Sequence, residues 1–203
     1  ELNISGDLHL YGQGMESDVV IKGGDVWLEE GYLELNDHTL TVEGNLYQSG
    51  GYMYIGTGTL DVSGDYRIQK QTVDEEGEIH WTSTGWNNGY LYMQDEAGKV
   101  IVGGDFVMQG YYSDLSAGTM ELYGDFEQKT WRRDGSSVTG NFWSHDDHMV
   151  VFKGKEAAIS FESSESYFGN METAEDTVVT ITGQFKLPVL KSELNISGDL
   201  HLY

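Results

Sequence analysis

Acidic residues recur along this chain directly after glycine, and their spacing could place a column of carboxylates along one edge of the fold. Carboxylate oxygens from stacked turns suit calcium, and the calcium candidates are Asp7, Asp25, Asp65, Asp105 and Asp125. The alternative is that each side chain caps a backbone N–H group in its own turn. Because the Gly-Gly-x-Gly-x-Asp nonapeptide of calcium solenoids is missing, we expect capping turns and no cofactor, with calcium as the alternative.

A second group of reactive side chains combines carboxylates with tryptophans. The candidate ligand patch consists of Trp81, Trp86, Asp74, Glu75 and Glu76. Aromatic ring faces stack on sugars and bind cations, so this segment could form a carbohydrate platform or a cation site. The alternative is that the tryptophans cover the wall of the fold while the acids stay solvated. In either case the segment reads as an inserted loop or hairpin.

The run His145-Asp146-Asp147-His148 contains four side chains that could bind zinc or a similar metal. Its spacing matches no ligand signature, and in a strand the two histidines would point to opposite faces. We therefore expect a solvated loop that leads into a strand at residues 149–152. The chain has no nucleophile elbow and no phosphate-binding loop, and we expect no enzymatic activity and no catalytic residues.

The elements that must position these residues are short strands. Apolar residues alternate in pairs, for example Leu40 with Val42 and Leu60 with Val62, which indicates strands with one buried face. No apolar pattern of period 3.6 persists, so we expect an all-β chain with little or no α-helix.

The Gly-Asp and Gly-Asn pairs set the period of the fold. Their glycines are separated by 18, 20, 20, 40 and 20 residues. The 27 glycines of the whole chain suggest many turns between short strands, because glycine supplies the positive φ angles that turns require. A coil of about 20 residues is the simplest unit, and the 40-residue interval holds either two coils or one coil with an insertion. A corner that recurs at constant intervals favours a β-solenoid, here a right-handed β-helix, over a sandwich of hairpins.

A longer repeat contains the shorter one. Residues 1–11 and residues 193–203 both read ELNISGDLHLY, an offset of 192 residues. We interpret residues 1–192 as one β-solenoid repeat unit and residues 193–203 as the start of the next identical unit. About ten coils would give a rod of ~48 Å per unit.

Three segments resemble a repeat found in giant secreted and surface proteins of clostridia and related Gram-positive bacteria. They are residues 44–51 (GNLYQSGG), 104–109 (GDFVMQ) and 159–164 (ISFESS) followed by Tyr167 and Phe168. More broadly, the chain is similar to right-handed β-helices of the filamentous-haemagglutinin and adhesin type. The resemblance implies an extracellular, secreted or cell-surface rod, stalk or filament, and it names no catalytic residue.

Composition excludes several classes of partner. The 11 basic and 34 acidic residues give a formal net charge of −23, which repels phosphate backbones and anionic lipid surfaces. We therefore expect no nucleic-acid partner. No apolar run reaches the roughly 18 residues of a membrane span, so we expect no membrane insertion in this segment. Any targeting or anchoring signals are expected outside it.

The sequence thus predicts a structural tandem-repeat segment of an extracellular bacterial surface rod, adhesin stalk or filament. Its expected partners are neighbouring repeats of the same protein, stacked end to end, with host or bacterial glycans as a further possibility. The alternative function is a polysaccharide-binding or polysaccharide-cleaving β-helix that uses the Trp-rich insertion around residues 74–90. A calcium-dependent adhesive module is a third hypothesis.

Overall fold

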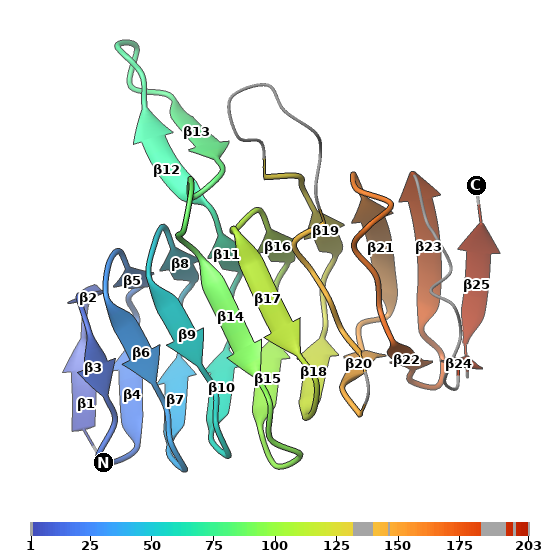
Figure 1. Cartoon of the computed structure of the whole chain (residues 1–203), viewed down its shortest axis with the longest axis horizontal. Coiled ribbons are helices and arrows are strands. Elements are labelled where there is room, and N and C mark those ends of the chain that lie inside the picture. The colour runs from blue at the N-terminus through green and yellow to red at the C-terminus, as the bar shows by residue number, and fades with distance from the viewer. Residues whose placement is uncertain (1, 132–139, 146, 184–193, 197, 203) are drawn as a thin grey trace.

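The fold is all-β and is built mainly from long parallel sheets. The computed structural model describes residues 2–131, 140–145, 147–183, 194–196 and 198–202. None of these residues lies in a helix, as the absence of a 3.6-residue pattern predicted. In Figure 1 the strands lie side by side in rows that run from the N-terminal to the C-terminal end. This arrangement is compatible with the expected β-solenoid.

Two nine-stranded parallel sheets, here called sheets A and B, form the length of the molecule. The strands of sheet A are, in order, β1 (Leu2–Ser5), β4 (Val19–Lys22), β7 (Thr39–Val42), β10 (Thr59–Val62), β15 (Lys99–Val102), β18 (Thr119–Leu122), β20 (Met149–Phe152), β22 (Asn170–Thr173) and β24 (Leu194–Ile196). The strands of sheet B are β2 (Leu8–Leu10), β5 (Val26–Leu28), β8 (Leu46–Gln48), β11 (Tyr66–Ile68), β16 (Phe106–Met108), β19 (Phe126–Gln128), β21 (Glu156–Phe161), β23 (Val178–Gly183) and β25 (Asp199–Leu202).

A third parallel sheet, sheet C, has five strands and is shorter than sheets A and B. A separate antiparallel hairpin projects from the molecule. Sheet C contains β3 (Gln13–Gly14), β6 (Tyr32–Glu34), β9 (Tyr52–Tyr54), β14 (Tyr90–Met93) and β17 (Tyr112–Leu115). The antiparallel hairpin consists of β12 (Lys70–Val73) and β13 (Ile79–Thr82) and extends away from the three sheets (Figure 1).

Each strand of sheet A is followed along the chain by a strand of sheet B, and we call such a pair a tier. The described residues form nine tiers, from β1–β2 to β24–β25. Eight steps between tiers therefore lead from Leu2 to Leu194, which is 192/8 = 24 residues per step on average. At ~4.8 Å per step these eight steps span ~38 Å. The expectation of about ten coils and ~48 Å was wrong.

Two long steps explain the difference in tier number. Thr59 pairs directly with Lys99, so the 40-residue interval holds one coil with an inserted hairpin, one of the two alternatives left open by the sequence. Thr119 pairs with Met149, which makes that step 30 residues long. Parallel pairing fixes only where the strands of adjacent tiers meet, and the connection between them can carry extra residues without changing the register.

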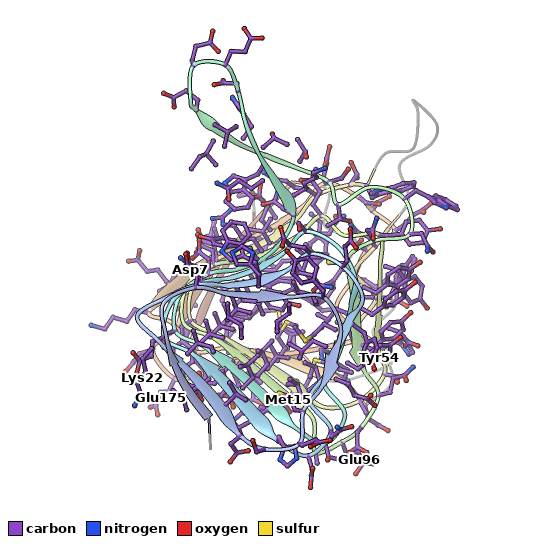
Figure 2. All side chains as sticks on the ribbon, turned by 90° about the vertical axis from the view of Figure 1, so that its left-hand side faces the viewer. Asp7, Met15, Lys22, Tyr54, Glu96 and Glu175 are labelled. Atoms are coloured by element: carbon purple, nitrogen blue, oxygen red, sulfur yellow. The ribbon has the colours of Figure 1, made fainter. Side chains whose placement is uncertain are left out.

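The core lies between the sheets, and alternation along each strand fills it. The predicted pairs Leu40 with Val42 and Leu60 with Val62 are buried, with Thr39 and Asp61 on the outer face only partly covered. Figure 2, which looks along the rows of strands, shows the ribbons around a filling of side chains. Burial of one strand face by period-two alternation is therefore confirmed.

Candidate functional site

The acidic side chains that follow glycine at the corners, here called the aspartate column, connect successive tiers. Their carboxylate oxygens accept hydrogen bonds from backbone N–H groups of the neighbouring tier. The N–H group of Asp25 donates to Asp7 Oδ1 at 3.0 Å, and the N–H group of Asn45 donates to Asp25 Oδ1 at 2.7 Å. The same contact continues upward, where the N–H group of Asp105 donates to Asp65 Oδ1 at 2.9 Å. Each side chain thus caps the corner of the next tier, whereas we had expected it to cap its own turn.

The upper part of this column is also occupied by hydrogen bonds. The N–H groups of Asp125 and Ala158 donate to Asp105 Oδ1 and Asp125 Oδ1 at 2.9 and 2.8 Å. The second oxygen of Asp65 accepts hydrogen bonds from Arg67 at 2.9 and 3.1 Å. Within the described ranges, no group of three or more His, Asp or Glu side chains is arranged to hold a metal ion.

The acidic part of the predicted ligand patch is the tip of the inserted hairpin. Asp74 accepts hydrogen bonds from the backbone N–H groups of Glu76 and Glu78, and its other oxygen contacts the His80 ring at 2.6 Å. The hydrogen bond from His80, followed by the backbone bonds, lowers the pKa of Asp74. Glu75 and Glu76 are exposed. These carboxylates therefore organise or surround a tight turn at the end of the hairpin.

The two tryptophans of the predicted patch lie against different surroundings. Trp81 packs on the outer face of sheet B, with its ring 5.1 Å from the ring of Tyr47 and 5.5 Å from the guanidinium carbon of Arg67. Trp86 is 52% exposed, and its ring lies 4.9 Å from Tyr111 and 5.5 Å from Trp131. The structure thus distributes the five predicted residues over the hairpin tip, the wall of sheet B and a separate aromatic cluster.

A tyrosine strip on sheet C was not predicted. Tyr52 stacks on Tyr90 at 4.5 Å and Tyr54 stacks on Tyr92 at 4.8 Å, with nearly parallel rings, and Figure 2 shows Tyr54 on the outside of the molecule. Burial is the main cause that raises the pKa of Tyr90 and of Tyr92 to about 12. The signal that could have revealed the strip is Gly-Tyr-x-Tyr, which occurs at residues 51–54 and again at residues 89–92.

A polar pocket of about 570 Å³ lies where the hairpin leaves the sheets. Its lining combines two turns, both ends of the hairpin and the loop that follows it. The lining residues are Glu29, Glu30, Gly31, Ser49, Gly51, Tyr52, Lys70, Thr84, Asn87 and Asn88. Neither Trp81 nor Trp86 is among them. The pocket is therefore close in sequence to the predicted patch but is built from different side chains.

The histidine-rich run does not form a solvated loop throughout. His148 is fully buried, and its Nδ1 lies 2.9 Å from Ser144 Oγ, while its Nε2 has no hydrogen-bond partner. Burial is the main cause that lowers the pKa of His148 to about 3. His145 Nε2 contacts Asp114 Oδ1 at 3.2 Å, and Asp146 lies outside the described residues. The predicted strand at residues 149–152 is confirmed as β20. The expectation of solvation was wrong for His148, because its side chain turns toward the core.

Comparisons of this chain with protein-family models, with curated proteins and with solved structures find no match. Among the described residues there is no helix that is long and apolar enough to cross a membrane.

Proposed function

We propose that the parallel sheets close into a right-handed β-solenoid that serves as a structural repeat unit of an extracellular bacterial surface rod, adhesin stalk or filament. In this proposal residues 1–192 are one unit and residues 193–203 begin the next. The partners are neighbouring units of the same protein, stacked end to end.

The observation that carries the proposal is the placement of the repeated sequence. The first copy contributes β1 to one end of sheet A and β2 to one end of sheet B, and the second copy contributes β24 and β25 to the opposite ends of the same sheets. Identical residues thus take equivalent strands eight steps apart. A further unit could continue both sheets in the same direction without a change of register, which is the arrangement of a solenoid array.

The exterior is consistent with a long soluble rod. The formal net charge of −23 opposes side-by-side association of such rods. In sheets A and B the strands of every internal tier are paired on both sides, so these two sheets leave edges, which can promote aggregation, only at the ends of an array. A structural role therefore needs no ligand and no catalytic residue.

The direct test is the length of a longer array. A chain that carries residues 1–192 twice, followed by residues 193–203, should have a maximum dimension ~38 Å greater than the present chain in small-angle X-ray scattering. The matched control places a flexible Gly-Ser linker after residue 192, which should broaden the distance distribution. Equal scattering profiles of the two longer chains, or separate unfolding of their two units, would contradict the proposal.

The location of the protein is tested separately on the cells that produce it. Antibodies against this segment should label intact cells or be recovered with protein from the medium. Labelling only after the cells are lysed would contradict an extracellular role.

A further inference from the structure

Tyr52 is the one aromatic residue among those that line the polar pocket. One face of this ring is covered by Tyr90 at 4.5 Å. Tyr32 is the strand partner of Tyr52 on the other side, yet their rings make no ring contact, and Tyr32 is 46% exposed. The tyrosine stack therefore ends at Tyr52, and Tyr52 is the tyrosine of the strip that lines the pocket. A planar ring at the end of a stack is a surface on which a sugar ring can lie.

The loop that contributes Thr84, Asn87 and Asn88 to the pocket is held in a defined conformation. The Thr84 hydroxyl donates to the Asn88 carbonyl oxygen at 2.7 Å, and the Tyr90 hydroxyl donates to Asn87 Oδ1 at 2.7 Å. Asn87 has a φ of 61°, a left-handed conformation that asparagine tolerates better than most residues. Asn87 and Asn88 are thus held at the pocket by a loop whose hydrogen bonds already exist, which lowers the entropic cost of ordering it for a ligand.

The charges at the pocket select against anions. The charged residues that line the pocket are Glu29, Glu30 and Lys70, and the Glu29 carboxylate also contacts the His9 ring at 3.2 Å. A hydrogen bond from Tyr11 is the largest cause that lowers the pKa of Glu29, so this carboxylate is ionised at neutral pH. The excess of carboxylates at the pocket has the same sign as the net charge of −23. A neutral ligand rich in hydroxyl groups meets acceptors, donors and an aromatic surface here without this repulsion.

We propose that this pocket binds a neutral carbohydrate, as one sugar unit or the end of an oligosaccharide. Tyr52 carries the sugar ring, and Asn87, Asn88 and Glu30 bind its hydroxyl groups. The pocket volume of about 570 Å³ lies within the roughly 300–1,000 Å³ of small-molecule sites. This binding site goes beyond the structural role, and it differs from the tryptophan patch that the sequence predicted.

Saturation-transfer NMR on the present chain tests the proposal, because it detects weak binding. The ligands are soluble oligomers of glucose, xylose, mannose and N-acetylglucosamine, with polygalacturonate as the anionic comparison. At least one neutral oligomer should receive saturation from the protein. Tyr52→Ala should weaken its binding at least tenfold, and Tyr52→Phe should keep binding within about threefold because the ring remains.

The matched control is Tyr54→Ala, which removes a tyrosine of the same strand and the same strip that does not line the pocket. It should leave binding within about twofold. If Tyr52→Ala does not fold, Asn87→Gly carries the test, since glycine keeps the left-handed backbone and removes the amide, and it should weaken binding about tenfold.

Three results would overturn the carbohydrate site: no transfer to any neutral oligomer, binding of polygalacturonate alone, or equal losses in Tyr52→Ala and Tyr54→Ala. None of these results bears on the length of the two-unit array, so a failure of the carbohydrate site leaves the structural proposal to its own test.

Discussion

At the scale of single residues, His148 is the buried titratable group with the clearest effect on stability. Burial lowers its pKa to about 3, compared with 6.5 for an unperturbed histidine. Above pH 6.5 the side chain is neutral in both the folded and the unfolded chain. Below that pH the unfolded chain binds a proton and the folded chain does not, so the free energy of unfolding should fall by about 1.4 kcal/mol per pH unit until pH 3.

Urea unfolding between pH 7.5 and pH 4.5 measures this contribution against His148→Gln, which does not titrate. The carboxylates contribute to both profiles, so the difference between the two profiles isolates the histidine. The variant is expected to lose less stability on acidification than the natural chain. Parallel profiles would show that the unpartnered Nε2 of His148 gains a proton without cost.

Asp105 separates the capping role of the aspartate column from calcium binding. Its Oδ1 accepts the Asp125 N–H group at 2.9 Å, and asparagine already performs the same contact at Asn45, which accepts the Asp65 N–H group at 2.8 Å. Asp105→Asn should therefore change the free energy of unfolding by less than about 0.5 kcal/mol. Asp105→Ala should cost about 1–2 kcal/mol, because the Asp125 N–H group loses its acceptor.

Thermal unfolding in chelator and in millimolar calcium checks both variants. If the aspartates only accept hydrogen bonds from backbone N–H groups, calcium should change none of the melting temperatures. A calcium-dependent rise in the natural chain that disappears in Asp105→Asn would instead support the metal hypothesis, since a ligand of the folded state stabilises it by mass action.

At the scale of the elements, the Gly-Asp corners need glycine for close approach between tiers. A Cβ atom on Gly104 would lie 2.8 Å from the carbonyl carbon of Gly64 and 2.9 Å from the backbone nitrogen of Asp65. Gly104 does not have a positive φ, unlike Gly23, which precedes the equivalent corner of an earlier tier. The turn conformation that we expected from the sequence therefore explains Gly23, and tier spacing explains Gly104.

Gly104→Ala should destabilise the chain by about 3 kcal/mol, because backbone atoms of the neighbouring tier must move. The control is Gly77→Ala in the hairpin turn, where a Cβ atom has nothing within 4 Å and only its φ of 85° opposes the substitution. That strain costs about 1–2 kcal/mol. Chemical denaturation compares the two variants, and a smaller loss for Gly104→Ala than for Gly77→Ala would contradict the proximity argument.

The strands and their buried faces could be predicted because alternation reports directly on burial. Leu40 with Val42 and Leu60 with Val62 are buried as expected. The contacts between residues of adjacent tiers could not be predicted in this way. The capping contacts between tiers, the stacking of Tyr52 on Tyr90 and the burial of His148 depend on which residues of adjacent tiers meet. When a step contains inserted residues, the sequence does not show which residues of the two adjacent tiers lie opposite each other.

At the scale of the whole molecule, the long repeat was visible in the sequence but the number of tiers was not. The identical segments at residues 1–11 and 193–203 give the offset of 192 residues. Division by a 20-residue coil overestimates the tiers, because the step from Thr59 to Lys99 and the step from Thr119 to Met149 are longer. The pocket was also missed, since turns and hairpin ends that are distant in sequence form its walls.

In the described part of the chain, each strand of sheets A and B pairs within its sheet only with the strands of adjacent tiers, and this order determines how the molecule would respond to tension. A folded tier adds ~4.8 Å to the length, whereas the 24 residues of an average step extend to ~80 Å when released. Pulled from its ends, an array would lose one tier after another from an end. It would dissipate a sudden load in many small extensions and could regain its length by rewinding onto the tiers that remain.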